Sequence, residues 1–319
     1  MKDVIKKINS SNSVAILTHI VEDGDALGSA LAMSCALRKM GKSATVYVSA
    51  KIEDKLSFLG EDYIIYSPEK LKEHDLCLCL DCGDEKRLGD RIEVFSKIKN
   101  SVNIDHHYTN TMYADVNYVE GDASSTGEIV YKLLKNMDIS IDKEIATYLY
   151  SAICSDTGSF KYSCTSPNTM RIAAELMEYN IAFDEISKLL FDTYTLDETH
   201  FRAELMSSVE GYAEGKIAVV AFEEELVLKY NITEENIPSV VDIPRGIKGC
   251  EIAIALKRIN GEVRANLRSN TDVNVSDIAK HFGGGGHVKA AGFRVKNALL
   301  EDVKKEVIDV SKKVLEQKI

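Results

Sequence analysis

Short apolar runs alternate with amphipathic helical stretches through the first part of the chain. Runs with the length and apolar character of buried strands lie at 13–19, 44–50, 76–80 and 101–104. Apolar residues recur at helical spacing over 26–40, 129–137, 143–154, 167–179 and 184–191. Strands that alternate with helices in this way predict an α/β domain with a doubly wound, mostly parallel sheet.

The pattern changes near residue 216, where a second and smaller α/β domain is predicted to begin. Its expected elements are a strand at 217–222, hairpin strands at 250–258 and 262–268, and helices at 275–282 and 299–317. The dipeptide Asn260-Gly261 is typical of a two-residue hairpin turn and therefore sets the register of that hairpin. The predicted organisation is a first domain over residues 1–192, a helical linker over 193–215 and a second domain over 216–319.

Three apolar runs of the first domain end in side chains that bind metal ions or move protons. These side chains are His19, Asp23 and Asp25 after the first run, Asp81 after the third, and Asp105, His106 and His107 after the fourth. Because the carboxyl ends of parallel strands share one edge of a sheet, we expect these groups to lie close together. Taken singly, Asp25 fits a helix cap and His19 fits a buried hydrogen-bonded residue. Their coincidence at one edge favours a metal site.

Four motifs occur in order: His-Ile-Val-Glu-Asp-Gly-Asp-Ala-Leu-Gly-Ser at 19–29, Asp81, Asp-His-His at 105–107 and Ser-Asp-Thr-Gly at 155–158. This order resembles the DHH phosphoesterase superfamily. A later stretch, Phe-Gly-Gly-Gly-Gly-His at 282–287, is similar to the signature of that superfamily's associated C-terminal domain. The subgroup that the chain most resembles contains nanoRNases and phosphatases of 3′-phosphoadenosine 5′-phosphate (pAp). One departure is Glu22, where many relatives have proline, and it affects the stiffness and charge of the loop without removing a ligand.

The resemblance implies a site for two divalent metal ions. The implied ligands are His19, Asp23 and Asp81 for one ion, and Asp25, Asp81, His106 and Asp156 for the other. Such an oxygen-rich ligand set favours manganese over zinc. The resemblance also implies that His107 contacts the scissile phosphate or protonates the leaving oxygen, and that Asp105 orients a histidine or the loop.

Charge is distributed unevenly between the two predicted parts. Residues 1–215 hold 22 Lys and Arg against 35 Asp and Glu, whereas residues 216–319 hold 17 against 15. An acidic chain with few aromatic residues is a poor binder of long nucleic acid, because that affinity rests on many phosphate contacts. Together with the resemblance, this implies short RNA or DNA oligonucleotides, or nucleotide bisphosphates, as partners.

The second domain offers groups that suit a phosphate. They are Arg268, Gly283, Gly284, Gly285, Gly286 and His287. Glycine-rich turns let backbone N–H groups approach phosphate oxygens closely, and four consecutive glycines cost too much conformational entropy for an ordinary loop. With the metals on the first domain and the phosphate contacts on the second, we expect an active site in a cleft between the domains.

The leading hypothesis is a manganese-dependent phosphoesterase that acts on nanoRNA, pApA or pAp through a two-metal-activated water. The alternatives left open are a cyclic di-AMP phosphodiesterase, an inorganic pyrophosphatase and a nucleotide-binding sensor without turnover. No apolar run approaches the roughly 20 residues that span a bilayer, so no membrane association is expected. Seven cysteines, mostly inside apolar patterns, fit reduced thiols in a cytoplasm. The commonness of twofold symmetry among oligomers favours a homodimer as the default assembly.

Overall fold

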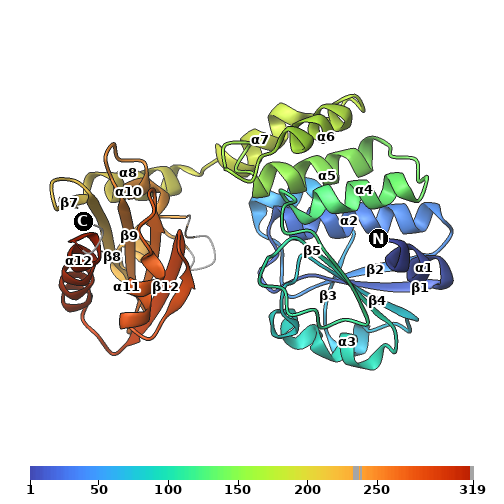
Figure 1. Ribbon diagram of the computed structural model, residues 1–319, viewed down its shortest axis with the longest axis horizontal. Coiled ribbons are helices and arrows are strands. Elements are labelled where there is room, and N and C mark those ends of the chain that lie inside the picture. Colours follow the sequence, from blue (N-terminus) through green and yellow to red (C-terminus); the bar gives the residue numbers. More distant parts are fainter. Residues whose placement is uncertain (233–236, 238, 317–319) are drawn as a thin grey trace. The chain divides into compact units, whose positions relative to one another are not determined.

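The computed structural model describes residues 1–232, 237 and 239–316, which fall into two compact units (Figure 1). Met1–Thr193 form the first unit and Tyr194–Ile319 the second. Each unit carries one six-stranded sheet with its own helices. The predicted class, an α/β sheet domain followed by a smaller α/β domain, is confirmed. Within the described residues, no helix is both long and apolar enough to cross a bilayer.

The sheet of the first unit is parallel throughout. Its strands are β1 (Ser13–Leu17), β2 (Ser43–Val48), β3 (Ile64–Ile65), β4 (Leu76–Leu80), β5 (Ser101–Asp105) and β6 (Val116–Val119). They lie in the order β3-β2-β1-β4-β5-β6, so β1 pairs with β2 on one side and with β4 on the other. Strands β2 and β3 extend the sheet to one side of β1, and β4, β5 and β6 extend it to the other, so the strand order reverses between β1 and β4. In open α/β sheets, ligands bind at this point, outside the carboxyl ends of the strands.

Helices cover both faces of this sheet. The helices are α1 (Lys2–Ser10), α2 (Gly24–Lys39), α3 (Ile92–Lys97), α4 (Thr126–Asn136), α5 (Lys143–Asp156), α6 (Pro167–Met177) and α7 (Phe183–Phe191). Figure 1 shows α2, α4 and α5 over one face and α3 over the other. Alternate residues of β1 serve the two cores: Ile16 packs in the core beneath α2, and Leu17 packs with Val94 of α3.

Glycines let α2, α4 and α5 approach one another closely. A Cβ atom on Gly28 of α2 would lie 2.6 Å from the carbonyl oxygen of Tyr148 in α5, and one on Gly127 of α4 would lie 2.5 Å from Cβ of Ala152. A Cβ atom on Gly24 would likewise lie 2.6 Å from Cβ of Ser155. Side chains at these positions would push the helices apart. The close packing places the start of α2 and of α4 beside the end of α5.

The second unit has a mixed sheet in the order β11-β12-β10-β9-β8-β7. Its strands are β7 (Glu210–Tyr212), β8 (Ile217–Glu223), β9 (Ile252–Ile259), β10 (Glu262–Ser269), β11 (Gly285–His287) and β12 (Ala290–Lys296). Its helices are α8 (Leu196–Ser207), α9 (Glu224–Lys229), α10 (Asp242–Arg245), α11 (Val275–His281) and α12 (Leu300–Glu316). Buried residues of α11 and α12 form the core on one face, and those of α8 and α9 contribute to the core on the other.

Several elements have no counterpart in the sequence-based prediction, namely β3, β6, β7, β12, α3, α9 and α10. The expected linker, residues 193–215, contains α8, which is grouped with the second unit because Phe201 and Leu205 are fully buried in its core. The sequence-based prediction assigned no strand to the glycine run, whereas Gly285–His287 pair with β12 as strand β11. Helix α1 has no counterpart in the prediction, and it packs Val4 and Ile8 into the first core. The last expected helical residue, 317, lies outside the described residues.

Candidate active site

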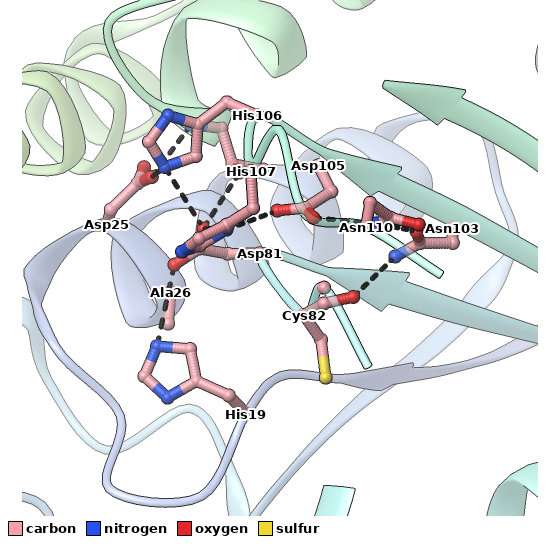
Figure 2. A network of polar contacts seen from close by, with 12 residues as sticks. His19, Asp25, Ala26, Asp81, Cys82, Asn103, Asp105, His106, His107 and Asn110 are labelled. Carbon is pink, nitrogen blue, oxygen red and sulfur yellow. Dashed lines mark hydrogen bonds and ion pairs between the residues drawn. The ribbon is translucent and has the colours of Figure 1, made fainter. Parts of the chain in front are cut away.

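The carboxyl ends of β1, β4 and β5 bring the predicted site residues together (Figure 2). His19 follows β1 by two residues, Asp81 follows β4 directly, and His106 follows β5 directly. Asp81 has a φ of 54°, a left-handed conformation that aspartate tolerates better than most residues. This turn ends the strand and lets the Asp81 carboxylate lie among the imidazoles, as Figure 2 shows.

Asp81 is the centre of the cluster. Its Oδ2 atom lies 3.5 Å from Nε2 of His19, and its Oδ1 atom lies 3.6 Å from Nε2 of His106 and 3.6 Å from Nδ1 of His107. Three groups of side chains in the described residues could hold a metal ion: His19, Asp23 and Asp81; Asp25, His106 and Asp156; and Asp81, His106 and His107. All six residues expected to bind metal lie in these groups. His107, expected to act on the substrate, is also a member of one.

The cluster has an excess of negative charge. Its carboxylates are Asp23, Asp25, Asp81 and Asp156, and within the described part of the chain all their ion pairs are with histidines. Burial, reinforced by Asp81 and Asp156, raises the pKa of Asp25 well above its usual value. Burial lowers the pKa of His19, but the carboxylates of Asp23 and Asp81 outweigh it and raise that pKa to about 10. Divalent cations would supply the positive charge that protons otherwise supply here.

The start of α4 supports two of these carboxylates. Asp25 accepts hydrogen bonds from the backbone N–H groups of Thr126, at 2.7 Å, and of Gly127, at 2.8 Å. The Thr126 hydroxyl donates to Oδ1 of Asp81 at 3.0 Å. The N-terminus of a helix stabilises an anion, so these hydrogen bonds oppose the rise in pKa that burial causes at Asp25. Asp25 is therefore not the cap of α2; that position is taken by Asp23, which accepts from the Ala26 N–H.

Asp105 and His107 form a hydrogen-bonded pair. Nδ1 of His107 lies 2.7 Å from Oδ1 of the fully buried Asp105, whose Oδ2 accepts from Asn110 at 2.6 Å. Burial alone would raise the pKa of Asp105, but the hydrogen bond with His107 outweighs it and lowers that pKa. The same bond raises the pKa of His107. The pair can therefore hold a proton on an imidazole that is one-third exposed.

Asn103 and Asn110 complete the support, and sequence reasoning missed both. Asn110 donates to Oδ1 of Asn103 at 2.7 Å, and Asn103 donates to the carbonyl oxygen of Cys82 at 3.2 Å (Figure 2). A continuous series of hydrogen bonds thus links Asp105 to the turn after β4. The only sequence signal is the position of Asn110 in the turn after the histidines, and asparagine is common in turns for purely local reasons.

Glu22, the residue that departs from the family pattern, is buried in an ion pair. Its Oε1 atom lies 2.6 Å from Nη1 of Arg91, and the carboxylate also accepts from the backbone N–H and the hydroxyl of Ser49. Arg91 in turn donates to the carbonyl oxygen of Tyr47 at 2.8 Å. The loop that carries His19 and Asp23 is therefore tied to the end of β2 through charge and hydrogen bonds.

Glu22→Gln is expected to lower the free energy of unfolding by about 3 kcal/mol, because it leaves the Arg91 guanidinium buried without its counter-ion. Urea denaturation of the purified variant measures this loss. The matched control is Glu93→Gln, which removes an exposed pair with Lys97 and should change stability by no more than about 0.5 kcal/mol. Equal stabilities of the two variants would contradict a structural role for the buried pair.

In the second unit, strand register places Arg268 and His287 in one row. Arg268 of β10 lies opposite Ala290 of β12, which lies opposite His287 of β11. Residues directly opposed in a sheet project to the same face. The residue between them is an alanine, so no large side chain separates Arg268 from His287 within the row.

A cavity of about 660 Å³ on the second unit is lined by Gly283, Gly284 and Gly285, but not by Arg268, Gly286 or His287. Its lining residues are Lys257, Arg264, Ala265, Asn266, Gly283, Gly284, Gly285, Gly292, Phe293 and Arg294. Arg264 lies opposite Lys257 on one side and Arg294 on the other. The sequence motifs indicated neither Lys257 nor Arg294 as a site residue, because only the strand register brings these residues together.

The glycine run has a steric role besides lining the cavity. A Cβ atom on Gly284 would lie 2.3 Å from the carbonyl oxygen of Gly292, and one on Gly286 would lie 2.5 Å from that of Ala290. Gly285 has open space at that position. Two of the four glycines are therefore required by the close approach of β11 to β12, whatever binds there.

Comparisons with known proteins agree with the two units. The family model for the N-terminal domain of the DHH family matches residues 13–153, and the model for the DHHA1 domain matches residues 214–317. The chain is 29% identical over 317 residues to a bifunctional oligoribonuclease and PAP phosphatase, NrnA, of Thermus thermophilus. That alignment covers 98% of this chain and 93% of the relative.

Solved structures show the same fold. An exopolyphosphatase-related protein from Bacteroides fragilis superimposes with a TM-score of 0.88 at 24% identity, over 99% of this chain and 95% of that one. RecJ from Thermus thermophilus, solved in complex with Mn²⁺, gives a TM-score of 0.57 at 13% identity, over 98% of this chain and 54% of RecJ. At these identities the likeness establishes the architecture alone.

Proposed function

The chain belongs to the DHH family and carries a DHHA1 domain, and from this premise we propose that it is a phosphoesterase that hydrolyses nanoRNA, pApA and pAp. The observation that carries the proposal is the convergence of four carboxylates and three imidazoles at the switch point of the sheet. The Thermus relative, named as an oligoribonuclease and PAP phosphatase and aligned over nearly the full chain, supports the substrate class. The acidic first unit also favours short substrates over long nucleic acid.

We propose two divalent ions as cofactors, with Mn²⁺ as the favoured metal because carboxylate oxygens and imidazoles dominate the site. The proposed ligands are His19, Asp23 and Asp81 for one ion, and Asp25, Asp81, His106 and Asp156 for the other. When bound, two such ions lower the pKa of a water molecule and neutralise charge on the phosphoryl oxygens. The buried carboxylates and the start of α4 hold the ligands in place.

His107 and Asp105 supply the proton chemistry in this proposal. Asp105 holds the Nδ1 side of His107, so Nε2 is left to face the substrate. A protonated His107 can donate to the leaving oxygen, and the raised pKa favours that protonated form. Asn110 keeps Asp105 oriented through its second oxygen.

We propose that the row formed by Arg268 and His287 holds a substrate phosphate. Arg268→Ala or His287→Ala is expected to weaken binding of pAp by about 1.5 to 3 kcal/mol, the loss of one charge-assisted contact. The small ester bis-p-nitrophenyl phosphate should be hydrolysed at the unchanged rate. Steady-state kinetics on both substrates measure this, with Arg171→Ala, an exposed arginine of α6, as control. A uniform loss on both substrates would mean that the row supports the fold or the metal site.

A substrate panel tests the proposed function directly. The panel comprises pAp, pApA, RNA of two to five nucleotides, a 20-mer, cyclic di-AMP and pyrophosphate, each with Mn²⁺, Mg²⁺ and Zn²⁺. We expect turnover of pAp and the short RNAs with Mn²⁺, and little of the 20-mer. Hydrolysis of pyrophosphate or cyclic di-AMP alone would select those activities instead. Tight binding of an intact nucleotide in the presence of Mn²⁺ would indicate a sensor.

The cytoplasm is the proposed compartment. All seven cysteines are free thiols, and Cys77, Cys79, Cys82, Cys154 and Cys250 are buried. Burial raises the pKa of the Cys82 thiol, next to Asp81, to about 12, so this thiol stays protonated and unreactive. Reduced, unpaired cysteines of this kind are typical of cytoplasmic proteins.

A further inference from the structure

An aromatic side chain stands exposed directly after the catalytic histidine of the proposal. Tyr108 is 79% exposed, although its neighbours His106 and His107 point into the metal cluster. The Tyr108 ring is large and exposed to water, whereas His19, Asp25 and Asp81 of the neighbouring cluster are polar and buried. The core does not account for the ring, because so little of it is buried.

Two contacts hold the Tyr108 ring in place. Its hydroxyl donates to Oδ1 of Asp122. A Cβ atom added to Gly121 would lie 2.4 Å from Cε1 of Tyr108, so the ring lies directly against the bare backbone at that glycine. Both partners belong to the loop between β6 and α4. The ring is therefore fixed at the carboxyl edge of the sheet instead of being free to turn into solvent.

The location suits one part of a nucleotide. Consecutive Cα atoms lie about 3.8 Å apart, so Tyr108 and His107 are within the span of a single nucleotide. Strand β6 pairs with β5, so the loop that holds the ring borders the strand end that carries His107. A phosphate at His107 would leave its sugar and base near the exposed face of the ring.

We propose that Tyr108 is a stacking platform for the base of the nucleotide whose phosphate lies at His107. The inference rests on the proposed function and adds a subsite for an aromatic base. Every base presents a π-face, so stacking of this kind accepts any short sequence. The packing of the ring on Gly121, which does not involve the hydroxyl, keeps the ring ordered before the substrate arrives and so lowers the entropic cost of binding.

The test compares pAp with a base-free ribose bisphosphate that carries the same two phosphates. Tyr108→Leu is expected to raise KM for pAp roughly tenfold, whereas Tyr108→Phe, which keeps the ring, should stay close to wild type. Neither change should alter KM for the base-free substrate. A kcat that stays the same for all three proteins with the base-free substrate would show that His107 is undisturbed.

Two results would overturn the platform while leaving the proposed function intact. One is an equal loss on pAp and on the base-free substrate, which would assign Tyr108 to positioning His107. The other is an unchanged KM for pAp in Tyr108→Leu. If the wild type hydrolyses no nucleotide, the proposed function itself fails. In that case the stacking role of Tyr108 is tested by calorimetric measurement of pAp binding in EDTA. Tyr108→Leu must then bind pAp about tenfold more weakly than Tyr108→Phe.

Discussion

Asp81→Asn is expected to lower kcat by about 10³-fold or more while the protein keeps its fold. Asp81 belongs to two of the three groups that could hold a metal, and it is the carboxylate we expect to serve both ions. Losing its charge removes several kcal/mol of electrostatic stabilisation, and each 1.4 kcal/mol corresponds to about a tenfold change in rate. Activity with Mn²⁺ and the number of bound Mn²⁺ ions per chain measure the effect.

Asparagine suits this position sterically, because it also tolerates the φ of 54° that Asp81 adopts. Asp138 offers a matched control. It has a φ of 53° and is exposed after α4, so Asp138→Asn makes the same chemical change in the same backbone conformation. That variant should keep wild-type activity. Near-normal turnover by Asp81→Asn with Mn²⁺ would refute the two-metal assignment.

His107→Ala is expected to lower kcat by about 10² to 10⁴-fold without loss of bound metal. The reason is that general acid–base groups contribute effects of this size, and we place His107 on the substrate. Its Nδ1 is already engaged by Asp105 at 2.7 Å, which leaves a single nitrogen for the reaction. Single-turnover kinetics on pAp and elemental analysis of the same sample measure the two quantities.

His106→Ala is the matched comparison, because the two imidazoles are adjacent and both lie 3.6 Å from Asp81. We expect this variant to lose one equivalent of Mn²⁺. The structure makes the comparison necessary, since His107 also belongs to a group that could hold a metal. Loss of one equivalent from His107→Ala, with full occupancy in His106→Ala, would show that the two roles are exchanged.

The strand ends that carry the chemistry were predictable from the sequence. Apolar runs predicted β1, β4 and β5 to within two residues, and the order of elements predicted a parallel sheet. These two facts suffice to bring His19, Asp81 and His106 to one edge, because parallel strands end on the same side. The hairpin turn at Asn260-Gly261 was equally local, and both residues have the positive φ that this turn requires.

The groups that hold the chemistry in place were decided by tertiary structure. Asp25 meets Thr126 and Gly127 about one hundred positions along the chain, at the start of another helix. Glu22 meets Arg91 across 69 positions. Neither contact has a local signature, because each depends on how α2, α4 and the segment before α3 pack on the sheet.

The second unit shows the same division. Its motif, glycines followed by histidine, was visible in the sequence, but the row that joins Arg268 to His287 exists only through the register of β10, β12 and β11. A shift of one residue would turn either side chain to the opposite face. Local patterns therefore predicted which residues could carry chemistry and at which strand ends they lie, whereas pairing and packing between distant segments determined which of them meet.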